Sequence, residues 1–181
     1  PATALKNAAD PVIAVIGNPN TGKSTLFNAL TGLRQKTANY PGVTVERHTG
    51  HIKLDGHNVT LVDLPGAYSI AAQSPDEMVA IDVLLGHVED LPRPRAVLAV
   101  VDATNLRRNL FLVTQLAELG LPMVIGLNMT DLAAAKGIEV DITALGAGLG
   151  AQVVALSAAR GTGLDELRSA LATAIDAPSP P

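Results

Sequence analysis

Apolar residues occur along this chain in short runs, most of which end at a glycine, an asparagine or an aspartate. The first run, PVIAVIG at residues 11–17, is wholly apolar and rich in β-branched residues, which is typical of a strand buried on both faces. Runs at residues 96–102, 122–128 and 152–156 have a similar character and predict three more strands of this kind.

Helices are expected in the intervals between these strands. Leu26, Phe27 and Leu30 recur at helical spacing after a glycine loop, which predicts a helix that begins near Lys23 and closes at Gly32. Further helices are expected near residues 76–85, 106–119, 132–136, 142–149 and 164–175. Asp141 is expected to cap the fourth of these further helices.

Residues 48–66 have a different pattern, in which two segments of alternating apolar and polar residues flank Asp55-Gly56. This dipeptide between alternating segments is typical of a β-hairpin, so one strand should run antiparallel. Strands that alternate with helices predict an α/β fold with a doubly wound, mostly parallel sheet of six strands and helices on both faces. A ligand of such a sheet binds at the carboxyl ends of its strands.

The composition agrees with a single domain. The chain has 181 residues, of which 48% are hydrophobic and only 2% aromatic, and this suits interlocking strands and helices. The scarcity of aromatic residues and a formal net charge of −4 argue against a nucleic-acid partner. No apolar run reaches membrane-spanning length, so this chain alone is expected to be soluble. Because cysteine is absent, disulfides and thiolate metal sites are excluded.

The two ends differ in composition from the rest of the chain. Residues 1–10 are interpreted as an N-terminal extension that lacks the apolar core of a secretory leader. The chain starts at Pro1 without a methionine, so we expect a trimmed chain. The ordered domain is expected over residues 11–176, and residues 177–181 are interpreted as a proline-rich linker or a cut end.

Residues 17–24, GNPNTGKS, match the phosphate-loop pattern G-x-x-x-x-G-K-S between a predicted strand and a predicted helix. Glycines allow backbone N–H groups to converge on the β-phosphate, and the helix N-terminus adds partial positive charge. Lys23 is expected to reach the β- and γ-phosphates, and the Ser24 hydroxyl to ligate Mg²⁺. The alternative, a chance glycine turn, is disfavoured by this context.

Residues 128–131, NMTD, stand at the end of a predicted strand. The carboxylate of Asp131 can accept both N–H groups on the N1 and N2 edge of guanine, and adenine has no such pair, so Asp131 should select GTP over ATP. Taken alone, this motif is more often a turn or a cap. Ser157 and the Ala158 N–H can supply donors to the guanine O6, although a serine at this place is also an ordinary helix cap.

Residues 63–66, DLPG, end the second strand of the hairpin. Asp63 can hold Mg²⁺ through a water molecule, and the Gly66 N–H can meet the γ-phosphate, so loss of that phosphate would free the following loop. In NYPGVTVE, at residues 39–46, Thr44 is the candidate for a second hydroxyl ligand of Mg²⁺. The alternative for Thr44 is an ordinary β-branched strand residue.

The motifs together resemble the guanine-nucleotide-binding domains of translation-factor-related GTPases. GNPNTGKSTLFNALTG, YPGVTVE, DLPGAYS and NMTD resemble more narrowly the N-terminal domain of the FeoB family of bacterial ferrous-iron transporters. The likeness covers roughly residues 11–175. It implies a Ras-like P-loop NTPase fold, GTP and GDP as ligands, and hydrolysis of GTP to GDP and phosphate.

The resemblance also carries an expectation about catalysis. Ras-like proteins place a water-orienting glutamine after the glycine of DLPG, but this chain has Ala67 there. In GTPases similar to this one, the asparagine that matches Asn20 helps to bind K⁺, whose shell is completed by backbone carbonyls of the first switch, and K⁺ offsets charge in the transition state. The unaided rate is expected to be on the order of 10⁻³ per second. Asn18 is interpreted as a loop residue that tolerates unusual backbone angles.

Members of the FeoB family usually continue into a helical regulatory domain and a membrane portion, and neither is present in these 181 residues. The resemblance therefore implies a cytoplasmic switch domain at the bacterial inner membrane whose partners are those two parts. The oligomeric state stays open, with a homo-oligomer as one alternative. Iron ligation is not expected in this chain, because scattered histidines without a carboxylate cluster are weak evidence for a metal site; they are His48, His51, His57 and His87.

Two other functions stay open from the sequence. One is a soluble K⁺-dependent GTPase of ribosome or transfer-RNA maturation, which the acidic balance and YPGVTVE disfavour. The other is a nucleotide-binding interaction module whose hydrolysis is incidental.

The predicted catalytic residues are Asn20, Lys23, Thr44 and Gly66. The predicted nucleotide-binding residues are Gly17, Asn18, Pro19, Asn20, Thr21, Gly22, Lys23, Ser24, Thr25, Gly42, Val43, Thr44, Val45, Glu46, Asp63, Leu64, Pro65, Gly66, Asn128, Met129, Thr130, Asp131, Ser157, Ala158 and Ala159. The predicted metal ligands are Ser24, Thr44 and Asp63 for Mg²⁺, with Asp63 acting through water, and Asn20 for K⁺.

Overall fold

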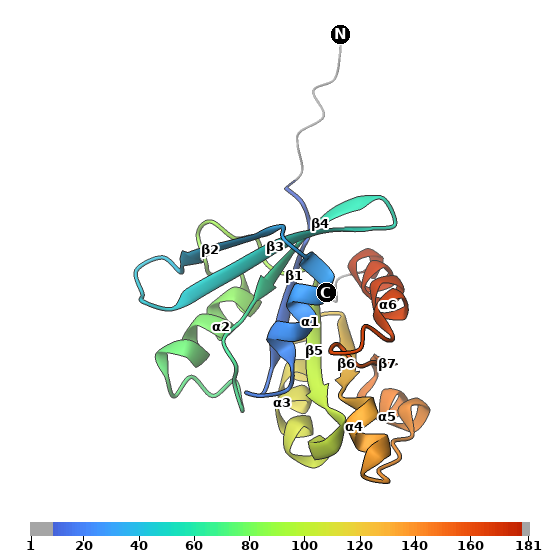
Figure 1. Ribbon diagram of the computed structural model, residues 1–181. Helices are drawn as coiled ribbons and strands as arrows, with labels where there is room; N and C mark the ends of the chain where they lie inside the picture. The colour runs from blue at the N-terminus through green and yellow to red at the C-terminus, as the bar shows by residue number, and fades with distance from the viewer. Residues whose placement is uncertain (1–8, 179–181) are drawn as a thin grey trace.

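A seven-stranded sheet forms the centre of the described part of the chain, with its strands in the order β2-β3-β4-β1-β5-β6-β7 (Figure 1). The computed structural model describes residues 9–178. The strands are β1 (Val12–Gly17), β2 (Gln35–Asn39), β3 (Glu46–Leu54), β4 (His57–Asp63), β5 (Ala96–Asp102), β6 (Met123–Asn128) and β7 (Gln152–Ala155). The helices are α1 (Lys23–Thr31), α2 (Pro75–Leu85), α3 (Leu106–Glu118), α4 (Thr130–Ala135), α5 (Ile142–Leu149) and α6 (Leu164–Asp176), and a 3-10 turn, η1 (Ala103–Asn105), precedes α3.

Two hydrophobic cores lie on opposite faces of the sheet, because successive side chains of a strand point to opposite faces. Ile13 of β1 belongs to the core formed with Leu26 of α1 and Leu171 of α6. Its neighbour Ala14 belongs to the other core, formed with Val83 of α2 and with α3. Figure 1 shows α1 and α6 on one side of the sheet and α2 and α3 on the other. The predicted doubly wound α/β fold is confirmed.

The reversed strand is β3, which pairs antiparallel with both β2 and β4, while the remaining pairs run parallel. The predicted hairpin turn is confirmed: Leu54 pairs with His57, and the two residues between them, Asp55 and Gly56, have φ of 47° and 81°. Positive φ at both central residues is typical of the two-residue turn that matches the twist of paired strands.

Strand β2 is an addition to the six predicted strands. Its sequence, QKTAN, is polar, and four of its five residues are exposed, so it has no hydrophobic pattern that could predict a strand. It is held at the edge of the sheet by its pairing with β3 from Gln35↔Gly50 to Asn39↔Glu46. The Gln35 amide also donates to Asn28 Oδ1 at 2.7 Å and to Thr31 Oγ1 at 2.8 Å, which joins the strand to α1.

Most predicted helix boundaries agree with the structure within one residue, and Asp141 caps α5 by accepting from the Ala144 N–H at 2.9 Å. The exception is α4, which begins at Thr130 rather than near residue 132. Met129 adopts a left-handed φ of 63° before it, and this turns the chain directly from β6 into the helix. Residues 1–8 of the predicted extension and 179–181 of the predicted linker lie outside the described residues.

Between residues 9 and 178, no helix has both the length and the hydropathy required to cross a membrane.

Gly50 provides a test of the packing between β3 and α1. A Cβ at Gly50 would lie 2.3 Å from Thr31 Cγ2, so Gly50→Ala should lower the free energy of unfolding by about 1–3 kcal/mol. Gly148→Ala in α5 is the control, because its added Cβ would meet nothing within 4 Å beyond its chain neighbours and the backbone of its own helix. It should be neutral or raise that energy by about 0.5–1 kcal/mol. Urea unfolding followed by circular dichroism measures both, and equal effects at the two glycines would refute the packing account.

Candidate functional site

The phosphate loop (residues 17–24) connects β1 to α1 at the carboxyl end of the central strands. A Cβ on Gly17 would lie 2.6 Å from the Val100 carbonyl oxygen, so the loop begins pressed against β5. Thr21 Oγ1 donates to the Asn18 carbonyl at 3.0 Å inside the loop, and Gly22, with φ of 78°, leads into the helix at Lys23. A cavity of about 430 Å³ opens at this helix N-terminus; it is lined by Asn18, Pro19, Asn20, Gly22, Lys23, Ser24, Thr25 and Gly66.

The two asparagines of the loop have different surroundings. Asn20 is exposed at the cavity and has a left-handed φ of 65°. Asn18 is only 3% exposed, its Nδ2 donates to the Arg108 carbonyl at 3.5 Å, and its Oδ1 is buried without a partner. The interpretation of Asn18 as the residue with unusual backbone angles is therefore wrong, because the strained position in this loop is Asn20.

The buried amide of Asn128 joins three loops. Its Nδ2 donates to the Thr21 carbonyl at 2.9 Å, and its Oδ1 accepts from the Ala158 N–H at 3.0 Å. A Cβ on Gly22 would come within 2.4 Å of the same Nδ2, so the close approach requires glycine. The phosphate loop, the end of β6 and the loop after β7 are therefore held in one arrangement by one side chain.

Asp131 lies in the first turn of α4, with 21% of its side chain exposed. Arg160 Nε lies 3.1 Å from Asp131 Oδ2. Burial raises the pKa of this carboxyl, but hydrogen bonding by Ser157 and by backbone N–H groups, together with the charge of Arg160, outweighs burial and holds the pKa below its ordinary value. Asp131 is therefore an ionised acceptor at neutral pH.

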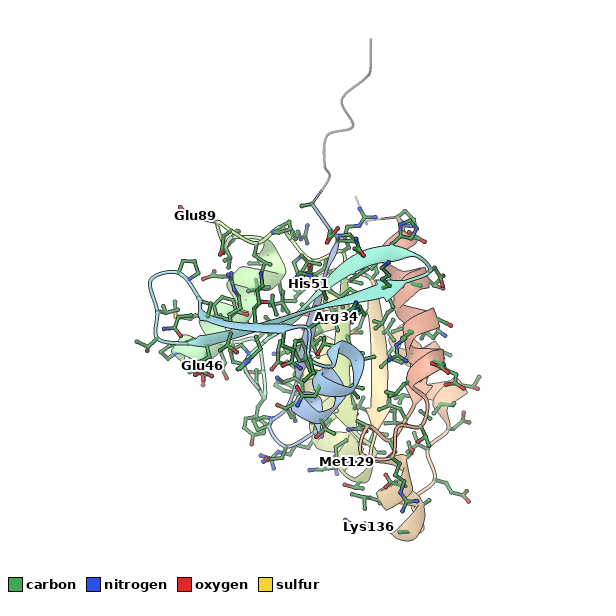
Figure 2. All side chains as sticks on the ribbon, turned by 45° about the horizontal axis from the view of Figure 1, so that its top comes forward. Arg34, Glu46, His51, Glu89, Met129 and Lys136 are labelled. Atoms are coloured by element: carbon green, nitrogen blue, oxygen red, sulfur yellow. The ribbon has the colours of Figure 1, made fainter. Side chains whose placement is uncertain are left out.

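The residues around Asp131 form one edge of the site. Thr130 Oγ1 donates to the Leu156 carbonyl at 3.0 Å, which ties the start of α4 to the end of β7. Met129 lies where the chain passes from β6 into α4, with Lys136 at the far end of that helix (Figure 2). The Met129 methyl group lies 3.4 Å from a Cβ placed on Gly22, so this edge adjoins the phosphate loop.

The ends of β1 and β4 bring the phosphate loop to the predicted switch residues. Lys23 forms a mostly buried ion pair with Asp63. The Ala67 N–H donates to the Gly17 carbonyl at 3.1 Å, and Ala67 is buried, with 2% exposed. A second cavity of about 370 Å³ shares Lys23 and Gly66 with the first, and its lining also includes Thr44, Val45, Glu46, His48, Asp63, Leu64, Pro65 and Asp76.

Thr44 is carried by a loop between two paired strands. We name residues 40–45, which connect β2 to β3, the switch I loop. The Tyr40 N–H donates to the Val45 carbonyl at 2.9 Å and closes the loop at its base. Gly42 and Val43 line a neighbouring hollow of about 410 Å³ with α2, and they take no part in lining the two cavities that hold Lys23.

Three residues that sequence patterns did not single out hold the base of the switch I loop. Tyr40 is 2% exposed, its hydroxyl donates to the Asp63 carbonyl at 3.5 Å, and burial raises its pKa. The Arg47 guanidinium lies 5.6 Å from the Tyr40 ring centre and donates two hydrogen bonds to the Asp90 carboxylate, both 2.8 Å long. Asp90 is 43 residues away from Arg47, so no local pattern could indicate the pair.

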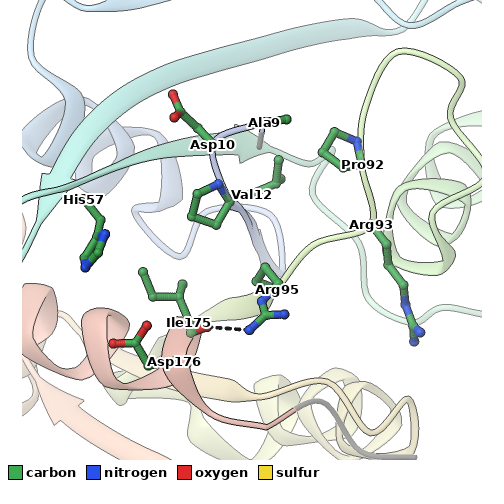
Figure 3. Close-up of a pocket in the computed structure, with 10 residues that line it drawn as sticks. Ala9, Asp10, Val12, His57, Pro92, Arg93, Arg95, Ile175 and Asp176 are labelled. Carbon is green, nitrogen blue, oxygen red and sulfur yellow. Dashed lines mark hydrogen bonds between the residues drawn. The ribbon is translucent and has the colours of Figure 1, made fainter. Parts of the chain in front are cut away.

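A separate pocket of about 360 Å³ lies at the opposite end of the central strands, where β1 and β5 begin (Figure 3). Arg95 and Asp176 line it, and Arg95 Nη2 donates to the Ile175 carbonyl at 3.0 Å. None of the predicted site residues lines this pocket. Within residues 9–178, no group of three or more His, Asp or Glu side chains is placed to hold a metal ion.

Comparison with known proteins relates the chain to one family. The family model described as "Ferrous iron transport protein B" matches residues 11–171. The Fe(2+) transporter FeoB of Escherichia coli (strain K12) is 50% identical over 137 residues, which are 74% of this chain and 17% of that protein. The Fe(2+) transporter FeoB of Salmonella typhimurium is 49% identical over 137 residues, which are again 74% of this chain and 17% of that protein. The chain thus spans 17% of the length of these curated relatives.

Solved structures of this kind are similar over nearly the whole chain. A mutant of S. thermophilus NFeoB bound to mGDP has a TM-score of 0.85 at 45% identity, covering 92% of this chain and 62% of that one. The FeoB G-domain of Methanococcus jannaschii has a TM-score of 0.80 at 42% identity, covering 94% and 100%. The cytosolic domain of the T. maritima FeoB iron transporter in its GMPPNP form has a TM-score of 0.87 at 36% identity, covering 93% and 65%.

Replacing Asn128 tests its role as the link between loops. Asn128→Ala leaves the Thr21 carbonyl and the Ala158 N–H buried without partners, so the free energy of unfolding without nucleotide should fall by about 2–4 kcal/mol. Asn128→Asp keeps an acceptor for Ala158 but turns a second acceptor toward the Thr21 carbonyl and buries a carboxyl group, so it should also destabilise the fold. Asn58→Ala, at an exposed position of β4, is the matched control. Urea unfolding measures the three variants, and a loss no larger than that of the control would contradict the structural role.

Proposed function

The chain belongs to the FeoB family, whose model covers residues 11–171, and on that premise we propose that it binds Mg²⁺·GTP, hydrolyses it slowly and acts as the switch of a ferrous-iron transporter. The observation that supports this proposal most directly is the convergence of Lys23, Asp63 and Thr44 on one cavity, joined through Lys23 and Gly66 to the phosphate-loop cavity. The carboxylate of Asp131, which would read the base, lies at the edge of the site that adjoins the phosphate loop.

The phosphate loop binds the triphosphate. Its N–H groups and the N-terminus of α1 attract the β-phosphate, and Lys23 pairs with the β- and γ-phosphates instead of with Asp63. The Gly66 N–H binds the γ-phosphate. The position of the segment after Gly66 therefore depends on whether GTP or GDP is bound. Asp131 reads the guanine, aided by the Ser157 hydroxyl and the Ala158 N–H.

The oxygen donors around Lys23 suit Mg²⁺. Two hydroxyls, of Ser24 and Thr44, and one carboxylate, of Asp63, line the two joined cavities, and Mg²⁺ prefers such hard oxygen ligands. Ser24 and Thr44 would hold the ion directly and Asp63 through a water molecule. When bound, Mg²⁺ neutralises charge on the β- and γ-phosphate oxygens.

Asn20 suits a monovalent cation at the same phosphates. Its amide is exposed at the cavity that Lys23, Ser24 and Gly66 also line, and an amide oxygen is a suitable ligand for such an ion. When bound there, K⁺ offsets charge that develops on the phosphates. Ala67 is buried and can orient no water, so the chain lacks the glutamine that positions the attacking water in Ras-like proteins. Its unaided hydrolysis is therefore slow.

The transporter role is a proposal about a larger protein. The relatives named Fe(2+) transporter FeoB are matched over 17% of their length, and we propose that iron passage itself takes place in parts of such longer proteins outside the matched share. We propose that the chain works at the cytoplasmic face of the membrane and passes the nucleotide state to the membrane portion. The switch I loop and the segment after Gly66 are the parts whose positions would change with the γ-phosphate.

Asp131→Asn tests base recognition. The amide presents a donor where the carboxylate accepted, so GTP affinity should fall by about 100-fold or more, and xanthine nucleotides should gain affinity. Asp141→Asn is the control, because Asp141 also stands at a helix start but caps α5, away from the site. Titration with fluorescent guanine and xanthine nucleotides measures the change, and an unchanged GTP affinity would remove the base-reading role from Asp131.

Asn20→Gly and Asn20→Ala together test the K⁺ site. Both remove the amide, but glycine accepts the φ of 65° whereas alanine is strained there by roughly 1–2 kcal/mol. The wild type should hydrolyse GTP faster in KCl than in NaCl in single-turnover assays, and both variants should lose this difference while GDP still binds to the glycine variant. If Asn20→Gly keeps the potassium advantage, the amide is not a cation ligand.

A further inference from the structure

Arg160 lies on a loop whose backbone is held in a fixed shape. We name residues 157–162 the base-side loop. Its ends are joined by two hydrogen bonds, each 3.1 Å long, between Ser157 and Thr162, and the Arg160 N–H donates to the Ser157 carbonyl at 3.2 Å. Ala158 of this loop is also bonded to Asn128. The Arg160 side chain is 72% exposed, so solvent offers it an alternative to its contact with Asp131.

The Arg160 side chain contacts the carboxylate that would read a guanine base. Its Nε lies 3.1 Å from Asp131 Oδ2, one of the two oxygens through which the carboxylate would accept the N1 and N2 donors of guanine. A carboxylate has only acceptors, and a guanidinium N–H offers it the same kind of donor as the base does. The Arg160 guanidinium thus stands against an oxygen that the base would use.

We propose that Arg160 is an intramolecular competitor of guanine, which lowers the affinity for guanine nucleotides and speeds their release. The inference rests on the proposed function of Asp131. When the base leaves, Arg160 pairs with the carboxylate and hinders immediate rebinding; when a base enters, it displaces the guanidinium into solvent. The ion pair is largely exposed, so its removal should change affinity by about two- to fivefold.

The sign of the effect separates this role from two others. If Arg160 instead oriented Asp131 for the base, removing it would weaken binding. Loss of a positive charge near an anionic nucleotide would also weaken binding. Only competition predicts that removal of the arginine tightens the complex.

Arg160→Met tests the proposal, because methionine keeps a long side chain but has neither charge nor donor. Arg168→Met is the matched control: Arg168 is another partly exposed arginine, and its Nη1 lies 3.2 Å from Asp165 in α6. The dissociation constant and the dissociation rate of a fluorescent GDP analogue are measured by titration and stopped flow. We expect Arg160→Met to bind GDP about two- to fivefold more tightly and to release it more slowly, with no such gain in Arg168→Met. Unchanged or weaker binding in Arg160→Met would overturn the proposal.

Two further measurements locate the effect at Asp131. The gain in GDP affinity of Arg160→Met over the wild type should shrink as salt rises from about 0.1 M to 1 M, because screening weakens the ion pair in the wild type. In an Asp131→Ala background, Arg160→Met should change nothing, and a gain that persists there would also overturn the competition. If Asp131→Ala alone leaves GDP affinity unchanged, base reading by Asp131 fails instead, so the two failures are distinguishable.

Discussion

The buried amide of Asn128 is the interaction on which the rest of the site depends. It bonds a carbonyl 107 residues earlier in the chain and an N–H group 30 residues later. Each of these segments is a loop, and a loop that is fixed only at its strand ends keeps considerable freedom. One satisfied side chain therefore sets the distance between the phosphate loop and Asp131. That distance decides whether a single nucleotide can reach both.

The phosphate loop is in turn the reference to which the switch segments are attached. Ala67 bonds the Gly17 carbonyl, and Lys23 pairs with Asp63, so the end of β4 is tied to the loop at two points. A phosphate group that drew Lys23 away from Asp63, as the proposed function requires, would free this carboxylate. On the proposed function, nucleotide binding and the position of Asp63 would thus be coupled through one lysine, without any need for movement in the sheet.

Sequence patterns were sufficient where residues adjacent in the chain carry the information. The buried strands, the Asp55-Gly56 turn and the motif from Gly17 to Ser24 are each contiguous, and the expected family is confirmed by the family match over residues 11–171. Strand β2 could not be predicted, because its polar residues become a strand only through pairing with β3. The contact of Arg160 with Asp131 likewise depends on the packing of two loops.

Strand β2, which the sequence did not predict, changes how Thr44 is understood. Because β2 and β3 pair as far as Asn39↔Glu46, the intervening switch I loop is a six-residue connection between paired strands and not a free segment. Tyr40, held under Arg47, anchors one end of that connection in the core. Because the Tyr40–Val45 hydrogen bond closes the loop at its base, we expect movement to be confined to the residues between them, which include Thr44. Loss of the γ-phosphate would therefore release a short, localised motion, and the pairing of β2 with β3 would confine it to the edge of the sheet.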